Sequence, residues 1–204
     1  MPSASENVAQ LLHDSAQSRP DAMAIAEPLG RDGSGNRKYR QVTFRELDED
    51  SSRIAAGLLE MGAEPGMRMA LLVRPGIEFI SLVFAMFKAG LVVVLIDPGM
   101  GRRSMIHCLS ESRPTGFIAL SLAQAIRTLL RRRFPEARLN VTVGRRWFWG
   151  GPTLKQLRAR ATGGVEMATV KAKDPAAIIF TTGSTGPPKG VLYRHGNFVH
   201  QARQ

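Results

Sequence analysis

The stretch that decides the fold reads AAIIFTTGSTGPPKG and spans residues 176–190. Residues 176–180 form a short apolar run, which is typical of a buried strand. Residues 181–190 form a loop of small residues that ends with a lysine and a glycine. Its glycines let the backbone approach a ligand closely, and its amides and hydroxyls form a concavity that suits phosphate oxygens. Lys189 adds a positive charge for the same anion, so the stretch predicts a phosphate-binding loop at the end of a strand.

The loop differs from the phosphate loop of the common nucleotide-binding proteins. That pattern needs a glycine before the lysine and a serine or threonine after it, whose hydroxyl binds magnesium. Here Pro188 precedes Lys189 and Gly190 follows it, and proline offers no amide donor. A plain turn between strands is the competing interpretation, since Gly, Pro, Ser and Thr are common in turns. Any three of these residues would fit a turn, but all ten together favour a phosphate loop of another type.

Apolar runs alternate with helical stretches along the rest of the chain, which predicts an α/β fold of βα units around a mostly parallel sheet. Strands are expected at residues 69–73, 91–96, 116–120, 139–143, 176–181 and 191–193, with a two-stranded element at 23–27 and 39–44. Helices are expected at residues 44–61, from 75, and at 105–112, 122–133, 153–160 and from 197. Thr43 and Glu46 have the spacing of a capping box for the first of these helices. Ligands of such sheets bind beyond the carboxyl ends of the strands, where the loop is predicted to lie.

Bulk properties point to a globular protein of a reducing compartment. The 204 residues are 44% hydrophobic and 22% charged, and Cys108 is the only cysteine, so no internal disulfide can form. No secretory signal is recognisable at the N-terminus, and we expect a cytoplasmic location. Residues 77–96 are mostly apolar but contain Glu78 and Lys88. A membrane span would tolerate that lysine poorly, so we interpret the segment as a buried helix followed by a strand.

Positive charge is concentrated in the second half of the chain. The net charge is +11, and residues 101–204 hold 18 of the 28 basic and 4 of the 17 acidic residues. The functional interpretation is a surface for nucleic acid, acidic lipid or an acidic partner. The competing one is a solvated face, which we favour because no nucleic-acid-binding motif accompanies the arginines. Residues 147–149, Trp-Phe-Trp, could stack on bases, but we expect them to anchor a loop to the core.

The loop resembles the phosphate-binding signature of the AMP-forming adenylating enzymes: acyl-CoA synthetases, luciferases and the adenylation domains of peptide synthetases. The resemblance extends to VTFREL at residues 42–47, FKAG at 87–90 and LIDP at 95–98, and to HGN at 195–197 after the loop. It covers residues 8–204, nearly the whole chain. Within the family, VRPGIEF at residues 73–79 and YRH at 193–195 look most like the olefin-pathway β-lactone synthetase branch.

The resemblance implies the N-terminal subdomain of the adenylate-forming fold and an enzyme that uses ATP and Mg²⁺. Its substrate would be a carboxylic acid, either a fatty acid or a β-hydroxy fatty acid. The ATP phosphates would be held by residues of the loop, namely Thr181, Thr182, Gly183, Ser184, Thr185, Gly186 and Lys189. His195 would line or orient the site without acting as a base. His195 and His200 lack the spacing and the acidic third ligand of a zinc site, so we expect no protein metal site.

The chain departs from the family in length. Full members run to several hundred residues and carry further motifs that have no counterpart in residues 1–204, including the adenine-binding segment, a Tyr-Gly-x-Thr-Glu motif and a lysine on a mobile C-terminal domain. We therefore expect residues 1–204 to form a truncated N-terminal part of an AMP-binding domain, with no complete catalytic set and without the remainder or the lid domain. A non-catalytic fragment and a basic binding module stay open as alternatives. A homo-oligomer or a partner would then cover the truncated face, and we expect no nucleic acid as partner.

Overall fold

The computed structural model describes residues 6–160, 165–181, 189–202 and 204 of the chain. Among them, six strands form the main sheet: β3 (Arg68–Leu72), β4 (Val92–Ile96), β5 (Gly116–Leu120), β6 (Leu139–Val143), β7 (Pro175–Thr181) and β8 (Lys189–Arg194). Their order is β6-β5-β3-β4-β7-β8. The first five are parallel to their neighbours, and β8 is antiparallel to β7. The predicted α/β fold with a mostly parallel sheet is confirmed.

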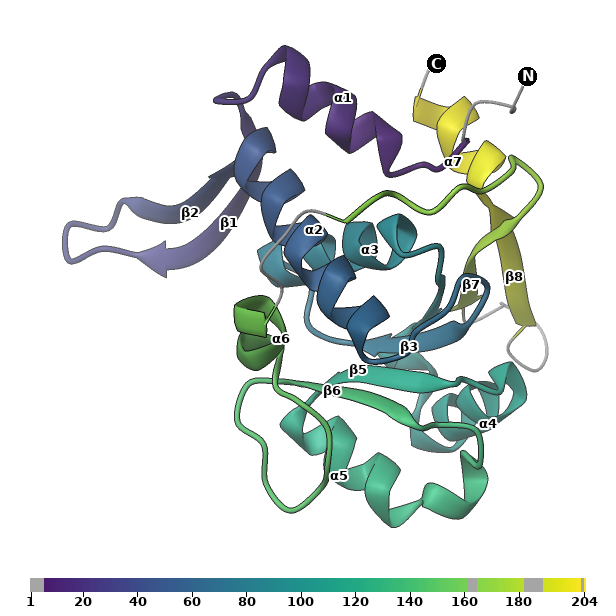
Figure 1. Cartoon of the computed structure of the whole chain (residues 1–204). Helices are drawn as coiled ribbons and strands as arrows, with labels where there is room; N and C mark the ends of the chain where they lie inside the picture. The colour runs from purple at the N-terminus through teal and green to yellow at the C-terminus, as the bar shows by residue number, and fades with distance from the viewer. Residues whose placement is uncertain (1–5, 161–164, 182–188, 203) are drawn as a thin grey trace.

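Helices cover both faces of this sheet (Figure 1). The described helices are α1 (Gln10–Ser18), α2 (Phe44–Glu60), α3 (Ile77–Lys88), α4 (Arg102–Ser112), α5 (Ser121–Leu129), α6 (Leu154–Arg160) and α7 (His195–Ala202), with short 3₁₀ turns η1 (Pro98–Met100) and η2 (Arg131–Arg133). One face carries α2, α3 and α6, and the other carries α4 and α5. The larger apolar core lies under α2 and α3, and a smaller one around Cys108, Phe117 and Phe134 lies on the α4 side.

The start of α2 shows how local sequence sets an element boundary. Thr43 Oγ1 accepts a hydrogen bond from the backbone N–H of Glu46 at 3.2 Å, and Glu46 Oε2 accepts one from the backbone N–H of Thr43 at 2.8 Å. This is the capping box that the sequence predicts. Leu47, Ile54 and Leu58 then bury one face of the helix, again as predicted.

Some boundaries and one helix differ from the predictions. Helix α1 is not predicted, since no side chain caps its first turn and no acidic residue lies there. The antiparallel pair β1 (Met23–Arg31) and β2 (Arg37–Thr43) is longer than expected. Helix α5 ends at Leu129 instead of residue 133, and η2 follows it. No described helix has both the length and the apolar character that crossing a bilayer requires.

A buried ion pair joins the helices on the α2 face. Lys88 Nζ donates to Asp48 Oδ1 at 2.6 Å, to the Asp48 carbonyl oxygen at 2.7 Å and to Ser52 Oγ at 2.8 Å. His13 Nδ1 of α1 lies 3.1 Å from Asp48 Oδ2. Burial lowers the pKa of Lys88 below its usual value, while the hydrogen bond and charge of Asp48 act in the opposite direction. Asp48 of α2 therefore connects α1, through His13, with α3, through Lys88.

Two expectations for aromatic and polar side chains are only partly correct. Trp149 is buried and donates from Nε1 to Thr142 Oγ1 at 2.8 Å, so it anchors its loop as expected. Trp147 and Phe148 are exposed, which the sequence-based interpretation did not foresee. The sequence predicts core packing for both His107 and Cys108 of α4. Cys108 is buried as predicted, whereas His107 projects into solvent near Glu111. Successive positions on a helix point about 100° apart, which separates these two neighbours.

Candidate functional site

The two ends of the predicted phosphate loop lie side by side at the carboxyl edge of the sheet. Thr181 is the last residue of β7, Lys189 is the first residue of β8, and the two are paired across the antiparallel ladder. Both are exposed. Residues 182–188 lie outside the described residues, and with them Thr182, Gly183, Ser184, Thr185 and Gly186. Their assignment to ATP phosphates stays a prediction, but the position at which the loop leaves the sheet is defined.

The end of the neighbouring strand β4 is tied to the base of this loop. The backbone N–H of Asp97 donates to the carbonyl oxygen of Phe180 at 3.1 Å. The side chain of Asp97 turns back on its own chain, with Oδ1 accepting from the N–H of Gly99 at 2.8 Å. Asp-Pro-Gly at residues 97–99 predicts a turn capped by Asp97, and this turn, which starts η1, is observed. Strand β4 is thereby held against β7 at the carboxyl edge, where ligands of such sheets bind.

The glycine that closes the loop motif has a packing reason in addition to any role at a ligand. Gly190 is paired with Phe180 across the β7–β8 ladder. A Cβ at position 190 would lie 2.8 Å from two ring atoms of Phe180, closer than side chains can approach without displacement. The absence of a side chain at Gly190 therefore leaves room for the Phe180 ring against β8.

An apolar cavity of about 480 Å³ opens at the carboxyl ends of β3, β4, β5 and β7, where Thr181 at the base of the loop contributes to its lining. Its wall is mostly aliphatic and aromatic, and Val73, Phe79 and Phe180 contribute to it. Arg74, Asp97 and Thr181 are the polar members of its lining. A concave apolar site with a few convergent polar groups is the usual form of a ligand pocket. The sequence reasoning did not assign Arg74 to the site, although its position after β3 was a usable signal.

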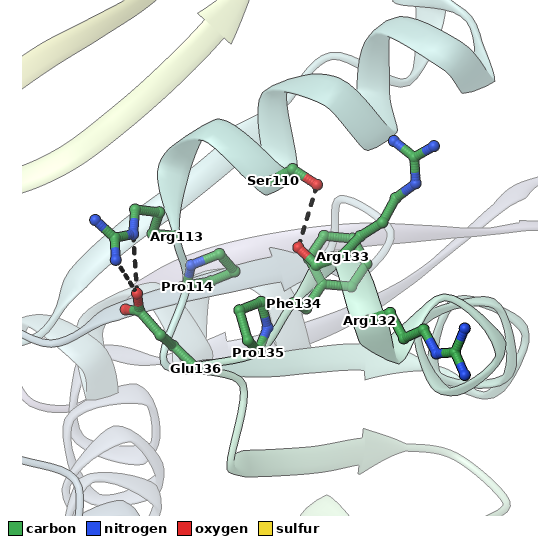
Figure 2. Close-up of a pocket in the computed structure, with 8 residues that line it drawn as sticks. All are labelled: Ser110, Arg113, Pro114, Arg132, Arg133, Phe134, Pro135 and Glu136. Carbon is green, nitrogen blue, oxygen red and sulfur yellow. Dashed lines mark hydrogen bonds and ion pairs between the residues drawn. The ribbon is translucent and has the colours of Figure 1, made fainter.

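A second cavity, of about 390 Å³, lies at the opposite edge of the sheet (Figure 2). Arg113 and Pro114 precede β5, and Glu136 precedes β6, so this cavity adjoins the amino ends of the strands. Arg113 donates from Nε to Glu136 Oε1 at 2.9 Å, with Nη2 at 2.7 Å from the same oxygen. Figure 2 shows the guanidinium of Arg132 directed away from this pair. Because this cavity adjoins the amino edge, whereas ligands of parallel sheets bind at the carboxyl edge, we place the candidate site at the carboxyl edge.

His195 begins α7 and is fully buried. Its Nδ1 accepts a hydrogen bond from the backbone N–H of Val8 at 3.3 Å, and its ring meets the Phe87 ring edge-on at a centroid distance of 5.7 Å. Burial lowers the pKa of His195, and the charge of Asp174 opposes that shift. An Nδ1 that accepts implies a neutral imidazole with its proton on Nε2. His195 is not among the residues that line the apolar cavity, so its predicted lining role stays untested.

Metal binding by this part of the protein finds no support among the described side chains. No group of three or more His, Cys, Asp or Glu residues in the described ranges could hold a metal ion. The expected use of Mg²⁺ therefore stays a prediction from the resemblance.

Comparison with known protein families settles which family this architecture represents. The family described as AMP-binding enzyme matches residues 12–204. The chain belongs to this family. The matched range runs from within α1 to the end of the chain and so includes β7 and β8 together with all the other strands of the main sheet.

Curated members of the AMP-binding family give a finer comparison. The chain is 49% identical over 199 residues to an olefin beta-lactone synthetase of Stenotrophomonas maltophilia, covering 96% of this chain and 36% of the relative. It is 48% identical over 197 residues to an olefin beta-lactone synthetase of Xanthomonas campestris, covering 96% and 35%. The resemblance to the β-lactone synthetase branch is confirmed. The chain spans about a third of the length of these relatives and corresponds to their N-terminal portion.

Solved structures confirm the fold. An anthranilate CoA ligase in complex with anthranoyl-AMP superposes with a TM-score of 0.83 at 20% identity, over 97% of this chain and 36% of that chain. A long-chain-fatty-acid-CoA ligase from Archaeoglobus fulgidus superposes with a TM-score of 0.80 at 22% identity, over 97% and 38%. At these identities the likeness establishes the backbone arrangement, which is that of the N-terminal part of adenylate-forming enzymes.

Proposed function

We propose that the chain is the N-terminal part of an ATP-dependent, AMP-forming acyl-adenylate ligase that acts on a fatty acid or a β-hydroxy fatty acid. The observation that carries this proposal is the position of residues 181–190. The stretch joins β7 to β8 at the carboxyl edge of the sheet, directly beside the apolar cavity. A phosphate loop next to an apolar cavity suits a pair of substrates in which one is a polyphosphate and the other an acyl chain.

The reaction would begin when a carboxylate oxygen of the acid attacks the α-phosphorus of ATP. The bond between that phosphorus and the bridging oxygen to the β-phosphate breaks, pyrophosphate leaves with the electron pair, and an acyl-adenylate forms. Negative charge grows on the leaving phosphates, so hydrogen-bond donors fixed in advance lower the barrier. In the proposal, the hydroxyls of Thr181, Thr182, Ser184 and Thr185 and the amides of Gly183 and Gly186 supply these donors, and Lys189 supplies a positive charge.

The identity of the acid is supported by the cavity and by the relatives. The cavity volume of about 480 Å³ and its aliphatic wall suit an alkyl chain. The two relatives at 48–49% identity are olefin beta-lactone synthetases, and a β-lactone contains the carboxyl carbon and the β-oxygen of a β-hydroxy acid. A β-hydroxy fatty acid is therefore the substrate that we favour.

We also propose that residues 1–204 act only as a part of the catalytic unit. The chain spans 36% of the length of its Stenotrophomonas maltophilia relative, and the adenine-binding segment and mobile lid domain of the family have no counterpart in residues 1–204. The 204-residue chain is accordingly expected to bind the phosphates of ATP without catalysing ATP–pyrophosphate exchange. Clear exchange by this chain, lost in Lys189→Ala, would contradict the proposed incompleteness.

Calorimetric titration of the chain with ATP and with pyrophosphate tests the phosphate site itself. A hydrogen bond to a charged group contributes about 1.5–3 kcal/mol, so Lys189→Ala should weaken binding by about 10- to 100-fold. Lys171→Ala is the matched control, because Lys171 is also exposed but precedes the amino end of β7. It removes the same charge from the other end of the strand. If the two variants lost affinity for ATP and pyrophosphate equally, the binding would be non-specific electrostatic attraction, and a phosphate site at the loop would be refuted.

A further inference from the structure

Helix α5 presents an apolar stripe to solvent. Leu122, Ile126 and Leu129 are 65%, 43% and 76% exposed, and their spacing of four and three residues places them on one face of the helix. The opposite face is fixed to the sheet: Gln124 is fully buried and donates from Nε2 to the carbonyl oxygens of Val141 at 2.9 Å and Phe117 at 3.3 Å. The buried amide therefore sets the rotation of the helix and keeps the stripe pointing outward.

Two exposed aromatic side chains lie on the loop that follows β6. Trp147 is 52% exposed and Phe148 is 68% exposed, while the next residue, Trp149, is buried and bonded to Thr142. The Trp149 ring contacts those of Trp147 and Phe148 at centroid distances of 5.4 and 5.1 Å. The loop is closed by a hydrogen bond of 2.7 Å from Arg146 Nη1 to the carbonyl oxygen of Gly151. The exposed rings of Trp147 and Phe148 therefore pack against the buried Trp149 within a closed loop.

The loop is joined to α5 where the helix begins. Ser121, the first residue of α5, donates from Oγ to the carbonyl oxygen of Arg145 at 2.5 Å. In Figure 1 the loop between β6 and α6 is drawn on the side of the sheet that carries α5 before it reaches α6. We call the apolar stripe of α5 and the aromatic pair Trp147 and Phe148 together the α5 surface.

Exposed arginines flank the two parts of the α5 surface along the chain. Arg145 and Arg146 are exposed next to the aromatic pair, and the exposed run Arg131–Arg133 follows the end of α5. Aliphatic, indole and guanidinium groups together are the chemistry by which a helix lies in the interface of an anionic membrane: apolar side chains enter the acyl boundary, tryptophan sits at the headgroups, and arginines pair with phosphates. Nucleic acid would use the arginines but would gain little from an exposed aliphatic stripe.

We propose that the α5 surface docks the protein on an anionic lipid bilayer. The helix would lie parallel to the membrane plane, with Leu122, Ile126 and Leu129 in the acyl boundary. Leu120, the last residue of β5, and Ala123, in the first turn of α5, line the apolar cavity at the carboxyl edge. Docking would therefore bring that cavity next to the lipid phase, from which an amphipathic acid could be delivered. The proposal stands on the α5 surface alone and does not depend on the ligase reaction.

Vesicle flotation tests the proposal on the 204-residue chain. The chain should float with vesicles of phosphatidylglycerol and phosphatidylcholine and stay behind with phosphatidylcholine alone. The double variant Leu122→Ser/Leu129→Ser should reduce partitioning into the anionic vesicles by at least about 10-fold. The matched apolar control is Leu29→Ser on β1, because Leu29 is 64% exposed and lies outside the α5 surface. Unchanged circular dichroism of each variant confirms that folding is retained.

Charge is tested in the same way with two triple variants. Arg131→Gln/Arg132→Gln/Arg133→Gln should weaken vesicle binding by at least about 10-fold. The control changes Arg37, Lys38 and Arg40 to glutamine on β2, where all three side chains are exposed; it removes the same net charge and should leave binding unchanged. Equal losses in the two triple variants would indicate general electrostatic attraction and would refute a defined surface.

Fluorescence reports insertion directly, because the chain contains only two tryptophans. Anionic vesicles should shift the emission of Trp147 to the blue, and the shift should vanish in Trp147→Phe, which leaves the buried Trp149 as the sole emitter. The proposal would be overturned if the chain did not bind anionic vesicles at low salt, or if the leucine variants bound them as well as the parent. It would also be overturned if the leucine substitutions converted a dimer of the chain to a monomer without weakening vesicle binding. Stronger, salt-sensitive binding to nucleic acid would likewise replace the membrane with another partner.

Discussion

Replacing Lys88 by methionine removes the buried cation that joins α3 to α2. The Lys88 side chain is 3% exposed and its Nζ lies 2.6 Å from Oδ1 of Asp48, whose side chain is 12% exposed. It also donates to the Asp48 carbonyl oxygen and to Ser52 Oγ. Methionine keeps the unbranched apolar stem, so the substitution removes the charge and the hydrogen bonds with little change of volume.

The expected loss of stability follows from the Asp48 carboxylate, which stays buried without its lysine partner. Removing one partner of a buried ion pair destabilises a protein by about 3–5 kcal/mol, because the other charge is left uncompensated. His13 still contacts Asp48 Oδ2 at 3.1 Å, but its side chain is 44% exposed and offsets only part of the loss. We therefore expect the lower end, about 3 kcal/mol, and a Tm lower by about 6–12 °C for a chain of this size.

Urea unfolding followed by circular dichroism measures this loss. The double variant Asp48→Leu/Lys88→Met removes both charges and should recover most of the stability. Arg45→Met is the control on an exposed pair, because Arg45 and Asp21 lie 3.3 Å apart with side chains 54% and 85% exposed; it should change stability by less than about 1 kcal/mol. A loss below about 1 kcal/mol in Lys88→Met, or a double variant as unstable as the single, would refute the reasoning.

Three further predictions concern His195, Gly190 and Thr43. Because burial lowers the folded-state pKa of His195 below its ordinary value of about 6.5, the unfolded state binds the proton more readily, and stability should fall as the pH drops below about 6.5. His195→Asn keeps a hydrogen-bond acceptor for the Val8 amide but does not titrate, so the free energy of unfolding should depend less on pH in this variant. The same pH dependence in the variant and the parent would contradict the role given to His195. Gly190→Ala should destabilise the chain by about 1–3 kcal/mol because the added Cβ clashes with the Phe180 ring. A variant with the same Tm as the parent would show that the ring moves aside without cost. Thr43→Ala should cost about 1 kcal/mol through loss of the capping box, seen as an earlier urea midpoint, whereas an unshifted midpoint would mean that the cap contributes nothing.

Local signals in the sequence were sufficient where the sequence itself sets the boundary. The Thr43–Glu46 capping box places the start of α2, and strands β5 and β6 have the predicted bounds because apolar runs end there in turn residues. Helix α1 was missed because its stability comes from tertiary contacts: Leu12 and Ala16 are buried, while no side-chain cap or acidic residue marks its start. Long-range packing is not encoded in a short window of sequence.

The candidate site was only partly predictable for the same reason. The loop motif at residues 181–190 could be recognised, and the parallel sheet predicted the edge at which it lies. The apolar cavity combines residues of β3, β4, β5 and β7, and their order in the sheet does not follow their order in the chain. The exposure of Trp147 and Phe148 beside a buried Trp149 depends equally on how one loop closes over Thr142. The sequence of three adjacent aromatic residues does not indicate which of them is buried.

The central claim, that residues 1–204 provide the phosphate-binding part of an acyl-adenylating enzyme, is tested most directly by a chimera. Residues 1–204 would replace the corresponding segment of the olefin beta-lactone synthetase of Stenotrophomonas maltophilia, to which they are 49% identical. We expect the chimera to catalyse ATP–pyrophosphate exchange that depends on a β-hydroxy fatty acid, with a rate that Lys189→Ala lowers about 10²- to 10³-fold and Lys171→Ala leaves unchanged. A folded chimera without acid-dependent exchange, or one equally active with Lys189→Ala, would contradict it.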